Sequence, residues 1–171
     1  MKTIELNSDQ IITLNDYPLY SDDVLIKYFD KCRQGQKLPF VPVIKKVIVK
    51  KYLNNKLLQE LEKFEKENPT AEYFMLDGSH RTTALTLADR KIIAIVYEKD
   101  KDITEAKKLV ATNQILENDM LNHNLIENCE ILDRHFTEKP YFMTVKQKTD
   151  KMIEDGILPQ NLKNTILGVI K

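Results

Sequence analysis

The sequence has no net charge, because its 26 Lys and Arg residues are balanced by 26 Asp and Glu residues. A domain that binds nucleic acid normally carries a basic excess that neutralises phosphate charge. The charge balance therefore argues against DNA as a favoured partner, although a neutral total still allows a local basic surface.

Glycine, proline and cysteine are also scarce, with 4, 6 and 2 residues. Few glycines and prolines, together with 42% hydrophobic residues, exclude a loop-rich or disordered chain and indicate a globular one. Cys32 and Cys129 are far apart and belong to no Cys-x-x-Cys or Cys/His cluster, which argues against a zinc site or a redox pair. We expect two buried free thiols.

Long apolar runs are absent as well. No stretch approaches the roughly 18 consecutive apolar residues that a membrane helix needs, and segment 1–10 is too polar for a signal peptide. The protein is therefore predicted to have no membrane partner and to be cytoplasmic.

The chain changes character near residue 100. Its 171 residues suffice for one hydrophobic core with a small appended unit. Before Asp100, apolar and β-branched runs predict strands within 3–14, 40–49, 71–76 and 92–97, and helical spacing predicts helices 22–33, 51–67 and 80–89. After Asp100 the apolar spacing is helical throughout. The prediction is a mixed α/β (α+β) fold, with a core of residues 1–100 that holds a small mixed sheet and a helical extension, residues 101–171, packed on it.

One turn combines the residue types that an anion site needs. A strand is predicted to end at Leu76, Gly78 turns the chain, and the next helix begins with polar residues. The first backbone N–H groups of a helix lack internal partners and lie at the positive end of its dipole, so they can hold a phosphate group. The candidate phosphate-binding residues are Gly78, Ser79, His80, Arg81, Thr82 and Thr83.

Each residue type in this turn has a use in phosphate chemistry. Gly78 lets the backbone approach closely, and Arg81 offers a pair of donors that matches phosphate oxygens. His80 can donate a hydrogen bond or act as an acid or base near neutral pH. Asp77 can bind a metal, orient His80 or cap the helix. The alternative is that Asp77 and Ser79 serve as helix caps and bind nothing.

Asp-Gly-x-His-Arg at a strand-to-helix turn, followed shortly by Ala84, resembles the signature of the ParB/sulfiredoxin superfamily. The preceding segment 38–44 is similar to a strand of that superfamily, and the resemblance covers roughly residues 11–97. It implies a ParB/sulfiredoxin-like core around the turn. Sulfiredoxins carry a reactive cysteine where this chain has Ser79, so the resemblance argues against sulfinic acid reduction.

The turn is closest to that of the free-serine kinases, which have Asp-Gly-His-His-Arg. This resemblance implies a phosphotransferase or nucleotide hydrolase that uses ATP or ADP with Mg²⁺, and a small-molecule hydroxyl acceptor. The acidic base of those kinases lies in the loop after the first strands, which makes Asp16 the candidate base, with Asp22 or Asp23 as substitutes. Asp77 and His80 complete the catalytic candidates. The alternative for Asp16 is a structural role in its turn.

Chromosome-partitioning ParB proteins use the corresponding turn to bind CTP. They also carry an asparagine on a following helix that helps to hold the metal and the nucleotide, and Asn113 has the similar position here, although Thr112 and Leu116 replace the neighbouring acid and arginine. Asn113 is therefore the metal-binding candidate. The alternative is that Asn113 binds nothing and is a polar residue at the end of an apolar helical face. The resemblance to the partitioning proteins implies a non-catalytic, nucleotide-responsive binding module. Such a module could also associate with DNA, and the candidate DNA-reading helix pair then lies at 144–162.

Two further expectations concern single residues. Arg81→Ala should abolish nucleotide binding without changing the secondary structure, because Arg81 is expected to contact the phosphate. The remaining histidines, His123 and His135, are predicted to be surface residues.

Overall fold

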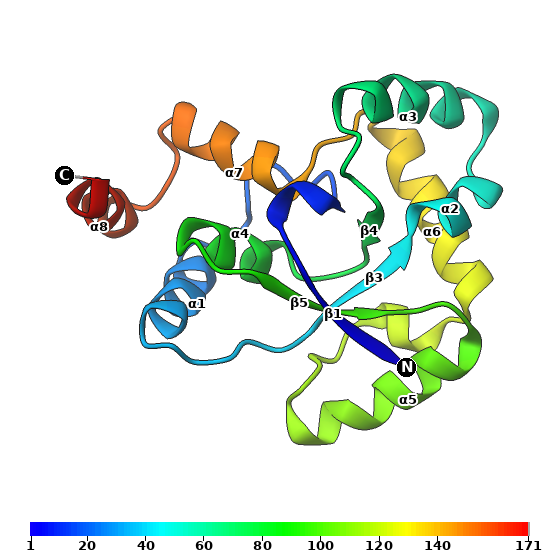
Figure 1. Ribbon diagram of the computed structural model, residues 1–171, viewed down its shortest axis with the longest axis horizontal. Helices are drawn as coiled ribbons and strands as arrows, with labels where there is room; N and C mark the ends of the chain where they lie inside the picture. Colours follow the sequence, from blue (N-terminus) through cyan, green and yellow to red (C-terminus); the bar gives the residue numbers. More distant parts are fainter. Residues whose placement is uncertain (171) are drawn as a thin grey trace.

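The computed structural model describes residues 1–170, with side chains through residue 166, and shows a mixed sheet between two layers of helices (Figure 1). Lys171, the last residue of the predicted helical extension, lies outside the described residues. The sheet has the strand order β1-β5-β3-β4-β2. Its strands are β1 (Lys2–Leu6), β2 (Ile11–Ile12), β3 (Val41–Lys45), β4 (Tyr73–Met75) and β5 (Ile92–Val96). β5 pairs in parallel with β3 and antiparallel with β1, whereas β4 pairs antiparallel with β3 and in parallel with β2.

Both faces of the sheet are covered at its central strands β3, β4 and β5. Successive strand residues point to opposite faces, so Tyr73 and Met75 of β4 pack in one core and Phe74 packs in the other. In β3, Val43 and Ile44 divide in the same way. Because both faces of the central strands are covered, β3, β4 and β5 read in the sequence as nearly continuous apolar runs, whereas only the last residue of the edge strand β1 is buried.

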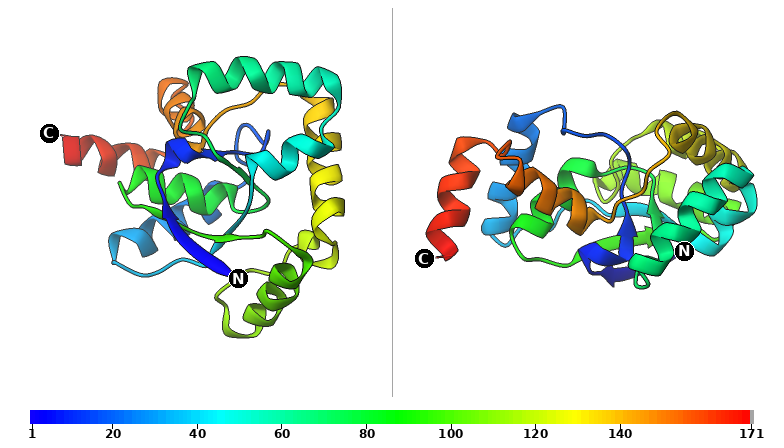
Figure 2. Two further views of the ribbon diagram at one scale, coloured as in Figure 1. Left: turned by 45° about the vertical axis from the view of Figure 1, so that its right-hand side comes forward. Right: turned by 90° about the horizontal axis from the view of Figure 1, so that it is seen from above.

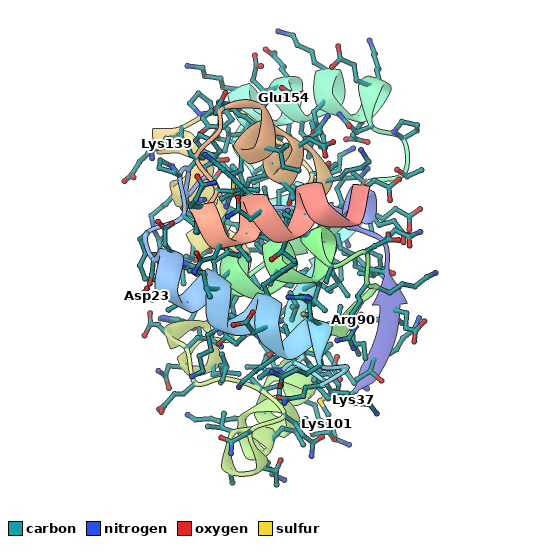
Figure 3. All side chains as sticks on the ribbon, turned by 90° about the vertical axis from the view of Figure 1, so that its left-hand side faces the viewer. Asp23, Lys37, Arg90, Lys101, Lys139 and Glu154 are labelled. Atoms are coloured by element: carbon teal, nitrogen blue, oxygen red, sulfur yellow. The ribbon has the colours of Figure 1, made fainter. Side chains whose placement is uncertain are left out.

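One face is covered by α1 (Asp22–Arg33), α4 (Ser79–Leu87), α7 (Val145–Glu154) and α8 (Gln160–Ile170). Figure 3 views this side and shows α8 crossing in front of α4, between α1 and α7. Leu25 and Phe29 of α1, Ala84 of α4, and Val145 and Met152 of α7 meet in the core beneath. Their helical spacing gives each helix one apolar face.

The other face is covered by α2 (Lys46–Val49), α3 (Asn55–Glu67), α5 (Asp100–Lys108) and α6 (Leu125–Glu138) (Figure 2, left). Phe136 of α6 packs between Phe74 of β4 and Phe142, with ring centroids 5.6 and 4.8 Å away. Thr144 forms an isolated antiparallel bridge to Ile12 of β2. The helices after residue 100 therefore contribute to both cores, while the division into two parts at residue 100 stays a prediction.

The α+β class is confirmed, and one strand boundary is wrong. β3 ends at Lys45, and residues 46–49, predicted as strand, form the single turn α2. The Lys46 N–H still donates to the Glu72 carbonyl at 2.7 Å, in register with the β3–β4 pairing, before the chain turns into α2. A 3₁₀ segment, Lys50–Tyr52, follows, and the helix expected from residue 51 begins at Asn55.

The structure bears on two predictions, one about the two cysteines and one about membrane-spanning helices. Cys32 and Cys129 are buried free thiols, as predicted. Burial raises the pKa of Cys32 and raises that of Cys129 to about 11, so both thiols stay protonated near neutral pH. Within residues 1–170, no helix combines the length and the apolarity needed to cross a membrane.

Candidate functional site

The turn between β4 and α4 has the geometry that the sequence predicts. α4 begins at Ser79, and Gly78 precedes it with a φ of 116°, a conformation that favours glycine. A Cβ atom at Gly78 would lie 3.2 Å from Arg81 Nη2 and 3.4 Å from Val41 Cγ2. Any side chain at this position would therefore strain the backbone and crowd Arg81.

Arg81 is bound by the protein itself. Its side chain is 2% exposed, and its guanidinium donates to the carbonyls of Pro39 (3.1 Å) and Phe40 (2.7 Å) and to the Asp77 carboxylate (2.7 Å). Burial lowers the pKa of Arg81, and the charge of Asp77 opposes that shift. Arg81 thus ties the start of α4 to the segment that enters β3. Arg81→Ala would remove these contacts too, so the variant does not isolate phosphate binding as the sequence led us to expect.

Thr82 and Thr83 belong to the interior of the fold. The Thr82 hydroxyl donates to the carbonyl of Gly78, the N-cap residue of α4, at 2.9 Å. Both threonines are buried, and neither lines the cavity beside the turn. The phosphate-binding candidates that face the cavity are therefore residues 78–81.

Ser79 and His80 are buried without hydrogen-bond partners. Their side chains are 7% and 6% exposed, and within the described chain neither Ser79 Oγ nor His80 Nε2 is paired. Buried polar atoms are normally paired, because an unpaired one costs about 1–3 kcal/mol. Ser79 is not a helix cap, since Gly78 is the N-cap residue, and the Asp77 carboxylate bonds Arg81. The first turn of α4 thus presents two side-chain groups and its own N–H groups as donors suited to an oxyanion.

The His80 ring is uncharged near neutral pH. Burial lowers its pKa, the charge of Lys148 lowers it further, and the charges of Asp16 and Asp77 oppose the shift. A neutral imidazole carries one N–H donor and one acceptor. His80 can therefore donate to a ligand or accept a proton from it.

A cavity of about 160 Å³ joins these groups to the loop between β2 and α1. It brings the three predicted catalytic residues, Asp16, Asp77 and His80, together with the turn 78–81. The apolar and aromatic part of its lining consists of Leu14, Tyr20, Val24, Tyr28 and Leu116. The lining therefore combines donors and charged groups with apolar and aromatic side chains.

Lys148 of α7 is the basic partner of Asp16. Its side chain is 1% exposed, and its ammonium donates to the Asp16 carboxylate and lies 3.5 Å from the Leu14 carbonyl. Burial lowers the pKa of Lys148, and Asp16 opposes this shift. Sequence reasoning missed Lys148. The available signal was its place on the same helical face as the buried Val145 and Met152, where a lysine is unusual unless it is paired.

Two further contacts hold the same loop against α6 and α7. His135 Nε2 accepts the Asn15 N–H at 3.0 Å, and the Tyr17 hydroxyl donates to the Asp155 carboxylate at 2.6 Å. His135 is half-buried rather than on the surface as predicted, and burial lowers its pKa. His123 is also partly buried. The acid-bearing loop is thus fixed by residues more than a hundred positions away.

The remaining candidates lie elsewhere. Asn113 is exposed, ends the 3₁₀ segment Leu109–Thr112 with a φ of 57°, and does not line the cavity. Asp22 and Asp23 are exposed in the first turn of α1, and Figure 3 shows Asp23 at the outer edge of that helix. The described residues contain no group of three or more His, Cys, Asp or Glu side chains placed to hold a metal ion. A metal ion at the cavity would take most of its ligands from a bound phosphate compound and water.

Comparisons with known proteins leave the family open. No family model, curated protein or solved structure matches this chain significantly. Membership of the ParB/sulfiredoxin superfamily therefore stays a prediction, based on the turn at 77–81 and the strand that precedes it.

Proposed function

We propose that the protein binds the phosphate groups of a nucleotide at the N terminus of α4 and transfers a phosphoryl group to a small-molecule hydroxyl. The observation that carries the proposal is the pair of buried groups, Ser79 Oγ and His80 Nε2, that have no partner in residues 1–170. A phosphate oxygen accepts hydrogen bonds from the Ser79 hydroxyl and from the His80 ring when Nε2 carries its proton. The dipole of α4 favours an anion at the same place.

The charges around the cavity favour a cation beside the phosphate. Lys148 is paired with Asp16 and Arg81 with Asp77, so the basic groups are already neutralised. Negative phosphate oxygens next to two carboxylates repel them unless a cation is present. Mg²⁺ is commonly held by one or two carboxylates together with phosphate oxygens, and Asp16 and Asp77 both remain partly exposed. Asp77 therefore fits as the carboxylate that helps to hold a magnesium nucleotide, and Asp16 is left for proton transfer.

Asp16 is the proposed general base. It lines the same cavity as the Ser79 and His80 donors, and its contact with Lys148 fixes its position. A carboxylate so placed accepts the proton of a hydroxyl acceptor, while the first turn of α4 stabilises the charge on the transferring group. Arg81 contributes by holding the turn in shape.

Ser79→Ala tests the phosphate site. Because the Ser79 hydroxyl has no partner among residues 1–170, its removal should leave the melting temperature of the ligand-free protein unchanged or slightly raised. The same change should weaken nucleotide binding by about tenfold and reduce the rise in melting temperature that the nucleotide causes. The measurement is a thermal shift with ATP, ADP, CTP and GTP, each with and without magnesium.

Ser21→Ala is the matched control. The Ser21 hydroxyl accepts the Val24 N–H at 3.3 Å and caps α1, so its loss should cost about 0.5–2 kcal/mol of stability while the nucleotide-induced shift stays intact. A wild-type protein that shows no shift with any of these nucleotides at millimolar concentration would refute the site. A loss of stability in Ser79→Ala equal to that in Ser21→Ala would give Ser79 a structural role instead.

A second candidate function is a nucleotide-responsive binding module without phosphoryl transfer. It is favoured by the direct links from the cavity loop to α7 and its C-cap, because Asp16 bonds Lys148 of α7 and Tyr17 bonds the C-cap residue Asp155. A shift of this loop on nucleotide binding would reach α7 through both contacts.

Asp16→Asn separates the two functions. Asparagine keeps an oxygen for Lys148 but is a poor proton acceptor, so a phosphotransferase should retain nucleotide binding and lose about a hundredfold or more in turnover. Binding is measured by isothermal titration calorimetry, and turnover by phosphate release and by transfer to a panel of small alcohols and hydroxy amino acids. Equal turnover in both proteins would remove Asp16 from the mechanism. Binding without turnover in the wild-type protein would favour the module.

The helix pair α7–α8 gives little support to a DNA-associated form. Lys148 of α7 is buried, and Lys146 and Lys151 form ion pairs with Asp150 (2.8 Å) and Asp155 (2.6 Å). A helix that reads DNA needs basic side chains that are available for phosphate. The basic residues of α7 are already paired with acids of the same protein.

A further inference from the structure

Tyr20 is an exposed aromatic side chain at the mouth of the cavity. It is 84% exposed, the highest value among the large apolar side chains of residues 1–166, and it lines the cavity together with the turn 77–81. An aromatic ring gains much by being covered, because it removes a large apolar area from water. Its exposure beside the cavity leaves a large aromatic surface available to a ligand bound there.

The ring of Tyr20 is not stacked on its neighbour. Its centroid lies 4.5 Å from that of His80, and the two rings meet at 80°, in an edge-to-face arrangement. The loop that carries Tyr20 forms an arch from β2 to the start of α1 (Figure 2, right). Tyr20 therefore stands at the surface, next to a residue of the candidate phosphate site, with most of its ring open to a further planar group.

The size of the cavity decides how much of a ligand it encloses. Pockets that bury a whole drug-sized ligand measure about 300–1,000 Å³, whereas this one measures about 160 Å³. The cavity is large enough for the phosphate end of a nucleotide, and the rest of the molecule must lie across the opening. Free inorganic phosphate would not use the aromatic and apolar lining that Tyr20 and Tyr28 provide.

The geometry points to Tyr20 as the platform on which the nucleobase stacks while the phosphate groups lie at the N terminus of α4. This inference rests on the proposed function and names the position of the base within the same site. Every nucleobase has a planar face, so stacking responds to ring area and not to the hydrogen-bonding edge. Purine nucleotides bind more tightly than pyrimidine nucleotides, and ATP and GTP bind alike.

The test compares two ligands that differ in the base. Magnesium ATP and magnesium tripolyphosphate are titrated by calorimetry into the wild-type protein and into three variants, Tyr20→Ala, Tyr20→Phe and Tyr141→Ala. Tyr20→Ala should weaken ATP binding by about tenfold or more and leave tripolyphosphate binding unchanged, whereas Tyr20→Phe should bind both ligands as the wild-type protein does. Tyr141 is 44% exposed and lies outside the cavity, so Tyr141→Ala controls for the loss of an exposed ring.

Three outcomes would overturn the inference, and each has its own pattern. If Tyr20→Ala binds ATP as the wild-type protein does, the base does not stack on Tyr20 and the phosphate site stands. If Tyr20→Ala weakens ATP and tripolyphosphate equally, Tyr20 acts through His80 and not through the base. If the wild-type protein binds neither ligand, the proposed phosphate site fails and the stacking fails with it.

Discussion

Arg81→Met is expected to lower the free energy of unfolding by about 3 kcal/mol. Arg81 is almost fully buried, and the substitution removes the donors from the carbonyls of Pro39 and Phe40 and from the Asp77 carboxylate. Methionine fills much of the same space but donates no hydrogen bond. The loss stays at the lower end of the range for buried ion pairs because Asp77 is partly exposed and can be solvated. Urea denaturation at neutral pH measures it.

Arg134→Met is the control for this substitution. Arg134 is an exposed residue of α6, so its replacement should change the stability by no more than about 0.5 kcal/mol. Arg81→Lys should recover little of the loss, because an ammonium cannot reproduce the planar set of donors that reaches three oxygens. Unchanged stability in Arg81→Met would show that these contacts are dispensable and would return Arg81 to the list of phosphate ligands.

The turn at 77–81 could be predicted from the sequence because its signals are local. The end of an apolar strand, a glycine and a polar helix start fall within a few residues, and the helix itself places Ser79 and His80 at its N terminus. The overall class could be predicted for a similar reason, since apolar runs and helical spacing reflect burial directly. The end of β3 was misjudged because the β-branched residues 47–49 favour a strand locally, whereas tertiary packing makes them a helical turn.

The roles of Arg81 and Lys148 could not be predicted because their partners are distant in the sequence. Arg81 bonds carbonyl groups 41 and 42 positions earlier, and Lys148 bonds Asp16 across 132 positions. From the sequence alone, a basic residue in a turn that resembles a phosphate-binding turn is interpreted as a phosphate ligand. Its burial and its neighbours, which only the structure shows, can change that interpretation. The sequence therefore identifies the donors of the candidate site but not the contacts that hold them in place.

The Asp16–Lys148 contact leads to the second large effect. Asp16→Ala is expected to lower the free energy of unfolding by about 3 kcal/mol near neutral pH, more than Asp16→Asn does. Lys148 is almost fully buried, and without the carboxylate its ammonium keeps only the Leu14 carbonyl, 3.5 Å away, among the contacts described. Replacing both residues, as Asp16→Ala with Lys148→Met, removes the unpaired charge and should restore most of the stability. Urea denaturation of the two single variants and the double variant gives the coupling between the residues.

The pH dependence of Asp16→Ala provides an independent check. Burial already lowers the pKa of Lys148, and removing the opposing charge of Asp16 lowers it further. The amine of the folded variant therefore releases its proton at a lower pH than the amine of the unfolded chain, whose pKa is about 10.4. Between these two pKa values the unfolded state binds more protons than the folded state. The stability of Asp16→Ala should therefore rise with pH and approach that of the wild-type protein near pH 10. The contrary result is a loss of stability in Asp16→Ala that is independent of pH, or one that is as large in the double variant as in the single one. Either result would mean that Lys148 does not fix Asp16, so that the proposed base would lack the contact that positions it.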